Sequence, residues 1–139
     1  MAHETDDPDP PPGVGPHELR ELELMLAGKK PAAMFSDAVI ARWIIPEDAF
    51  EPHVQAGRII KRVVFEPNPG SFDAIRVYYA LPGEEWRIDA LDAINNAIHS
   101  KLRPATGQDD IDTGRLLGYT EEEIAIYLAW VAHAWPPQG

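Results

Sequence analysis

Two runs of β-branched and aromatic residues on either side of a turn constrain the fold more than any other feature of the sequence. Residues 58–66 and 73–81 have the composition of strands, and residues 67–70 (Pro-Asn-Pro-Gly) have turn chemistry. A connection this short predicts an antiparallel hairpin. Because an isolated hairpin is only marginally stable, we expect a third strand, formed around Ala33 or Trp43.

Three segments have the apolar spacing of helices. The first begins near Pro16, and the second runs from about residue 84 to residue 102. The third opens at Thr120, where Glu123 three residues later completes the pattern of a capping box. We expect the helices to bury the stripes Leu19, Leu22, Met25 and Leu26; Trp86, Ala90, Leu91, Ile94, Ile98 and Leu102; and Ile124, Tyr127, Leu128, Val131 and Trp135.

Two segments are less clearly patterned. Residues 32–45 contain a possible short strand, and the apolar residues after Asp37 fit a helix, irregular structure or a strand. Residues 104–113 are polar and predict a loop. The sequence therefore predicts an α+β protein with a small antiparallel sheet and helices packed on one face of it.

The domain organisation follows from composition. Residues 1–15 are acidic and rich in proline and predict a disordered tail, and residues 136–139 predict a second, shorter tail. Residues 16–135 fit one globular domain. There is no cysteine, which excludes disulfides and thiolate metal sites. With no basic and apolar leader and no long apolar run, we expect a soluble, cytoplasmic protein that does not bind membranes.

The charge is unevenly distributed. The net charge is −11, and residues 84–139 hold ten acidic against four basic side chains, whereas residues 16–83 are nearly neutral. Such acidity repels nucleic-acid phosphates, so direct binding of nucleic acid is disfavoured. It is typical of a solvated acidic face or of a surface that meets a basic partner.

No motif indicates a metal or cofactor. Asp110, Asp112 and Glu121 have the spacing of a calcium loop, but Arg115 stands where the sharp turn of such a loop needs glycine. No histidine pair has the spacing of a zinc site on a helix. Phosphate-binding and nucleophile motifs are also missing, so we expect no cofactor, and the sequence favours a protein without catalytic activity.

One face of the predicted hairpin combines arginine and tyrosine. Arg62, Arg76 and Tyr78 fall on the same side of the two strands, where they are expected to cluster. Arginine and tyrosine are frequent binding residues, and paired arginines can hold a carboxylate or phosphate. The alternative is a solvated face whose arginines pair with nearby acidic side chains.

Two hypotheses of function follow. The first is a small, acidic, non-catalytic interaction protein, such as an inhibitor, an immunity-type protein or a regulatory module, which binds a protein partner. Trp130 is a candidate contact with the partner, and the partner can also be a second copy of the chain in a homo-oligomer. The alternative is a small enzyme or ligand-binding domain whose site lies between the sheet and the helices. That site would use Arg62, Arg76, Tyr78, Arg87 and His99, the last paired with Asp92 as acid and base.

Overall fold

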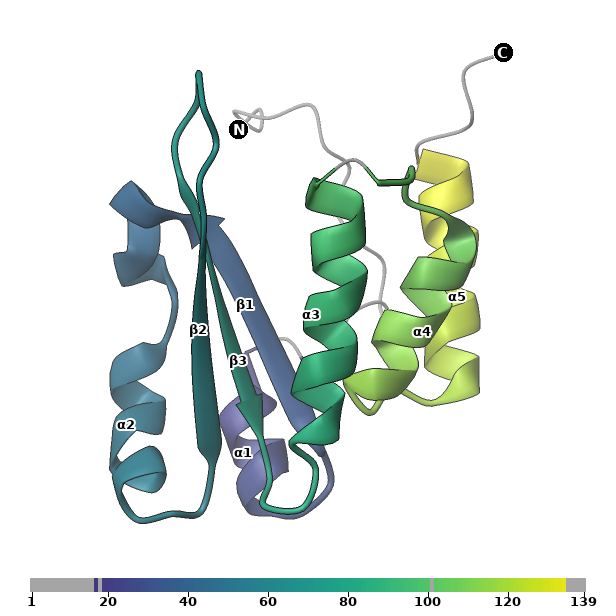
Figure 1. Cartoon of the computed structure of the whole chain (residues 1–139). Coiled ribbons are helices and arrows are strands. Elements are labelled where there is room, and N and C mark those ends of the chain that lie inside the picture. Colours follow the sequence, from purple (N-terminus) through teal and green to yellow (C-terminus); the bar gives the residue numbers. More distant parts are fainter. Residues whose placement is uncertain (1–16, 18, 101, 135–139) are drawn as a thin grey trace, which may run out of the picture.

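A three-stranded antiparallel sheet lies at the centre of the structure, with helices on both of its faces (Figure 1). The structure is a computed structural model that describes residues 17, 19–100 and 102–134. Along the chain its elements are α1 (Glu21–Leu26), β1 (Ala32–Ala38), the 3-10 helix η1 (Val39–Ile44), α2 (Glu47–Gln55), β2 (Ile60–Glu66), β3 (Ala74–Ala80), α3 (Trp86–His99), α4 (Gly107–Leu116) and α5 (Glu121–Ala134).

Strand β3 is the middle strand of the sheet, which has the order β1-β3-β2. Val77 of β3 lies opposite Phe35 of β1 on one side and Val63 of β2 on the other. Six consecutive residues, 75–80, are buried. Because successive side chains of a strand point to opposite faces, this run requires that both faces of the sheet be covered.

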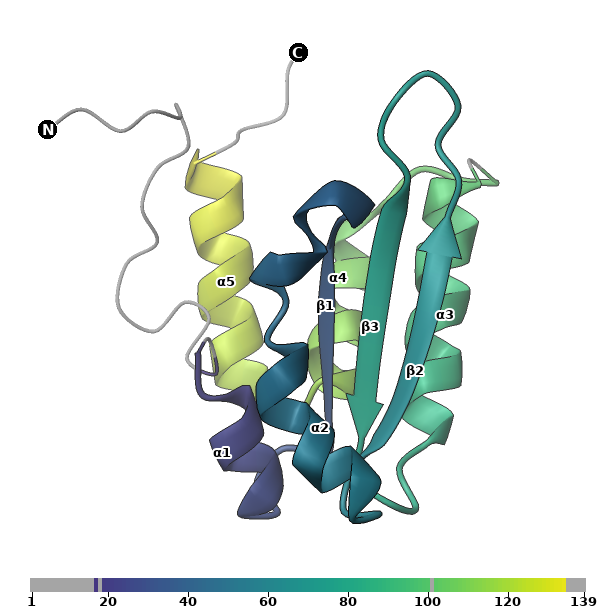
Figure 2. The ribbon, with the colours of Figure 1, turned by 90° about the vertical axis from the view of Figure 1, so that its left-hand side faces the viewer.

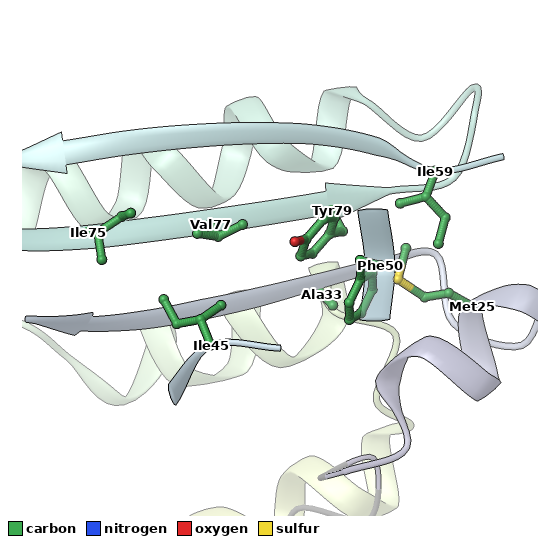
Figure 3. Packing of buried hydrophobic residues seen from close by; sticks show 8 residues of the cluster. All are labelled: Met25, Ala33, Ile45, Phe50, Ile59, Ile75, Val77 and Tyr79. Carbon is green, nitrogen blue, oxygen red and sulfur yellow. The ribbon is translucent and has the colours of Figure 1, made fainter. Parts of the chain in front are cut away.

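The first face is covered by α1, η1 and α2 (Figure 2). The ring of Phe50 from α2 stacks on Tyr79 of β3 with centroids 4.0 Å apart. Figure 3 shows how the β3 side chains Ile75, Val77 and Tyr79 line this core. Fully burying an aromatic or aliphatic side chain of this kind contributes about 1.5–3 kcal/mol, so this core fixes the helices to the sheet.

The second face is covered by α3 and α4. Tyr78 and Ala80 of β3 pack there with Ile88 and Leu91 of α3. Helix α5 lies outside α4 in Figure 1 and approaches it closely at Gly114, where an added Cβ atom would lie 2.8 Å from Cγ1 of Ile124. Because Gly114 has no side chain, the backbone of α4 can pack directly against the Ile124 side chain of α5.

The α+β fold, the antiparallel hairpin and a third strand are confirmed. The third strand comes from the segment around Ala33, which forms β1. The layering differs from the prediction, since helices cover both faces of the sheet and not one. The second face of β3 carries Arg76 and Tyr78, whose polar groups are typical of a solvated face, yet α3 covers them.

The predicted loop at residues 104–113 is wrong, because Gly107–Leu116 forms α4. Its start carries a capping box in which the Thr106 hydroxyl accepts a hydrogen bond from the backbone N–H of Asp109, and the Asp109 carboxylate accepts one from the Thr106 N–H. This pattern was visible in the sequence. The polar composition of the segment concealed it, because only a narrow side of α4 is buried.

Several expected core positions are exposed. Helix α3 packs through Ile88 and Leu91, which rotates Trp86 outwards so that 53% of it is exposed, and Leu102 lies beyond the end of the helix. The capping box at Thr120 and Glu123 is confirmed, and Ile124 is buried as expected. The other expected core residues that are exposed are Leu19, Leu26 and Tyr127; Trp135 and both predicted tails lie outside the described residues.

Candidate functional site

Arg76 and Tyr78 form a buried polar network between β3 and α3. The Arg76 Nε–H donates a hydrogen bond to the Tyr78 hydroxyl at 3.0 Å, and that hydroxyl donates to Asp92 of α3 at 2.9 Å. Nη2 of Arg76 also lies 3.4 Å from the Asp92 carboxylate. Positions 76 and 78 share a strand face, which is why both side chains meet α3.

Two asparagines of α3 complete this network. Asn95 donates to the Tyr78 hydroxyl at 3.1 Å, and Asn96 accepts a hydrogen bond from Nη2 of Arg76 at 3.0 Å. Burial, the largest influence, raises the pKa of Tyr78 to about 12. The phenol therefore stays protonated and holds its hydrogen bond to Asp92 throughout the neutral range.

The burial and pairing of Arg76 indicate that this network stabilises the contact between β3 and α3. The Arg76 side chain is only 3% exposed, and its charge faces the carboxylates of Asp92 and, at 3.8 Å, Glu66. A buried cation that is already paired with carboxylates has no free charge to offer an anionic ligand. Nη1 of Arg76 has no hydrogen-bond acceptor among the described residues.

The other predicted site residues lie apart from this network. Arg62 of β2 lies directly opposite Tyr78 of β3 in the strand pairing. Its Nη1 pairs with the carboxylate of Asp89 at 2.7 Å near the solvent. Arg87 donates to the carbonyls of Arg115 and Leu116 at the end of α4. His99 is exposed in the last turn of α3, and half-buried Trp130 of α5 lies 6.1 Å from the ring of Tyr127.

The structure therefore brings together Arg76, Tyr78 and Asp92 and separates them from His99. Asp92, the predicted acid-base partner of His99, bonds to Tyr78 and Arg76. Asp110 and Asp112, the first two positions of the calcium-like spacing, lie within helix α4. Within the described part of the chain, no group of three acidic or histidine side chains could hold a metal ion.

A second buried cluster surrounds Lys30. Its ammonium donates to Nδ1 of His17 at 2.9 Å and to the carbonyl of Leu117, and it lies 4.7 Å above the ring of Tyr119. The His17 ring stacks on Tyr119 with centroids 4.0 Å apart. These contacts join the start of the described chain to the connection between α4 and α5.

The electrostatics of the Lys30 cluster follow from its burial. Desolvation is the main reason that the pKa of Lys30 falls to about 8, and it also lowers the pKa of His17. Glu123 lies 4.0 Å from Nε2 of His17 and opposes both shifts. Lys30 is only 1% exposed, so its amine is not accessible to a dissolved substrate. The sequence carries no signal for this cluster, because its members are far apart along the chain.

Five exposed apolar side chains come from the elements at the end of the sheet that carries the β2–β3 connection. In η1, Ile40 and Trp43 are both exposed and lie on either side of a kink at Ala41. Trp43 is 82% exposed. We call this region the hairpin-end surface, and it consists of Ile40, Trp43, Ile44, Phe65 and Phe72.

Two contacts hold the parts of the hairpin-end surface at the same end of the molecule. The backbone N–H of Val39, the first residue of η1, donates to the carbonyl of Asp73, which follows Phe72 in the connection. The guanidinium of Arg42 lies 5.7 Å above the ring of Phe65. An open recess lined by Gly70, Ser71 and Phe72 lies at the tip of the connection. Figure 2 shows η1, between β1 and α2, beside the base of this connection.

The sequence analysis missed the hairpin-end surface. Its apolar residues have the same composition as a core stripe, so a pattern alone indicates burial for them. The one signal in the sequence was the isolated Phe72 in a turn segment, where an exposed aromatic residue has no structural reason.

Comparisons of this chain with protein families, curated proteins and solved structures gave no match. The geometry of the chain itself is therefore the basis for a function. Among the described residues no helix has the length and apolar character needed to cross a membrane.

Proposed function

We propose that this protein is a non-catalytic interaction protein that binds a protein partner through the hairpin-end surface. The observation that carries the proposal is that five of the exposed large apolar side chains belong to elements at one end of the sheet. Exposed apolar groups gathered in one region are typical of protein interfaces. Tryptophan is also among the residues that contribute most to binding energy.

The arrangement of these side chains supports docking. Ile40, Trp43 and Ile44 project from a short helix, and Phe65 comes from a strand to which that helix is tied through Arg42. Their backbones belong to ordered elements, so little conformational entropy is lost when a partner covers them. Burying one such side chain fully stabilises a complex by about 1.5–3 kcal/mol.

The alternative of a small enzyme receives less support. Its site needs Arg76, Tyr78 and His99 around an accessible hollow. Arg76 and Tyr78 are buried and bonded to α3, whereas His99 is exposed to solvent. The polar residues that a catalytic site needs are thus already used by the fold.

Position-specific photo-crosslinking tests the proposal. A photoreactive phenylalanine analogue is placed at Trp43 or at Phe72 of the full chain, and the protein is irradiated in the cells that naturally express it. A matched control carries the analogue at Gln55, which is exposed at the far end of α2. We expect the same crosslinked protein from positions 43 and 72 and none from position 55.

A second variant makes the test independent of the crosslinker. Replacing Trp43 with serine in the chain labelled at position 72 is expected to lower the yield of the crosslinked product severalfold, because an apolar contact is lost. Equal yields at positions 43, 72 and 55, or no product at positions 43 and 72, would overturn the proposal.

A further inference from the structure

We infer that the partner at the hairpin-end surface is a basic protein, whose contact region has an apolar centre surrounded by lysine and arginine. This inference rests on the proposed function and adds the chemistry of the partner. Its basis is the charge around the hairpin-end surface, where exposed carboxylates border the apolar side chains.

Three acidic residues border the hairpin-end surface. Asp37 precedes η1 at the end of β1, and Asp48 follows it in the first turn of α2. Asp73 follows Phe72, and its carbonyl accepts the hydrogen bond from Val39 of η1. Asp48 and Asp73 are exposed. Oδ1 of Asp73 accepts a hydrogen bond of 3.1 Å from the backbone N–H of Asn68, and neither carboxylate makes an ion pair among the described residues. They are available to a cationic partner.

Arg42, which contacts Phe65 of the hairpin-end surface, is already neutralised. Arg42 donates two hydrogen bonds of 2.8 Å to the carboxylate of Glu47. Lys61 lies 3.0 Å from the same carboxylate and 3.4 Å from Glu51. Hydrogen bonding from Arg42 is the main reason that the pKa of Glu47 falls to about 2, so these pairs persist through the neutral range. The net field at the border of the surface is therefore negative.

The charge also argues against a second copy of this chain as the occupant. A two-fold symmetric contact would place the same surface patch of both copies together. Asp48 and Asp73 of one copy would then meet the acidic border of the other, and like charges brought together in this way cost several kcal/mol. A basic partner instead gains steering during encounter and complementary pairs at the rim.

Selection from a random-peptide phage library tests this inference and does not require the partner itself. The full chain is the bait, and phage that also bind the variant Ile40→Ser/Trp43→Ser are removed. Both positions are exposed, so the variant should keep its fold, which circular dichroism checks. We expect the remaining peptides to carry net positive charge and at least one large apolar residue.

Charge reversal then separates local from global electrostatics. The variant Asp48→Lys/Asp73→Lys is compared with Asp110→Lys/Glu122→Lys, which changes the net charge equally at exposed positions elsewhere. We expect the first variant to weaken binding of a selected synthetic peptide by more than about tenfold and the second by less than about threefold.

The outcomes distinguish the inference from the function on which it rests. If peptides that need Ile40 and Trp43 are neutral or acidic, or if the two charge variants weaken binding equally, the basic partner is wrong while the docking surface stands. If no peptide distinguishes the native chain from the Ile40→Ser/Trp43→Ser variant, the docking surface itself is overturned.

Discussion

Burial decides whether a polar side chain of this protein is accessible to a ligand. Arg76 and Tyr78 have the composition of a binding site, but α3 covers them, and Asp92 and Asn96 accept hydrogen bonds from them. Removing one partner of such a buried ionic contact typically costs about 3–5 kcal/mol. Replacing Arg76 is therefore expected to weaken the contact between the sheet and α3.

Lys30 gives the stability of the protein a defined dependence on pH. Its pKa is about 8 in the folded chain, against an ordinary value of 10.5, so between these values the unfolded chain binds more protons. The free energy of unfolding is expected to rise from pH 8 towards pH 10.5, by a total of about 3 kcal/mol from this group. Below pH 8 both states are protonated and this slope vanishes.

Urea unfolding of the native chain and of Lys30→Met at a series of pH values measures this effect. The native chain should gain stability relative to the variant across that interval, because methionine keeps the apolar contacts and cannot titrate. Taking the difference between the two chains removes the contribution of the tyrosines, which titrate in both. Parallel curves for the two chains would show that Lys30 has an ordinary pKa in the fold.

The elements of the second face depend on a close approach between α4 and the start of β1. Gly118, which follows α4, has a φ of +90°, and an added Cβ atom would lie 2.5 Å from Cδ of Pro31. A left-handed conformation of this kind favours glycine. The contact lies next to the Lys30 cluster, so this connection is held both by backbone geometry and by a buried cation.

Gly118→Ala is expected to destabilise the protein by more than about 1 kcal/mol, because both the positive φ and the contact with Pro31 disfavour a side chain. Gly107→Ala is the matched control, since an added Cβ atom at Gly107 meets nothing within 4 Å and its φ is not positive. Thermal unfolding of both variants measures the difference. Equal melting temperatures would contradict the close approach at Gly118.

At the scale of the whole molecule, stability is expected to be greatest in the middle of the sheet. Strand β3 pairs on both sides and is covered on both faces, whereas the connection at residues 67–73 is exposed. Regions with few buried contacts open at low free energy, and core strands open only with global unfolding. The connection at residues 67–73, beside the hairpin-end surface, is therefore expected to open at a lower free energy than β3.

Native-state hydrogen exchange tests this distribution. Amides of β3 should exchange most slowly, with an opening free energy close to that of global unfolding, and amides of residues 68–72 should exchange fastest. The N–H of Val39 should be protected by its hydrogen bond to Asp73. Fast exchange in β3 would mean that the sheet is not the stable centre of the fold.

The sequence by itself determined the local structure of this protein. β-branched residues and a turn of proline and glycine specified the hairpin, and the capping box at Thr120 specified the start of α5, because these preferences act over a few neighbouring residues. The helix at Gly107–Leu116 was also encoded locally, in the cap formed by Thr106 and Asp109. The composition and the net charge of the chain also follow directly from the sequence.

Only the tertiary structure decided which side chains reach solvent. The pattern of apolar residues is the same for a side chain that packs on the sheet and for one that faces outwards, so Trp43 and Trp86 had the composition of core residues although both are exposed. Conversely, Lys30 and Arg76 became buried because segments distant in sequence cover them. Burial depends on how elements pack in space, and that is the reason the hairpin-end surface emerged from the fold and not from the sequence.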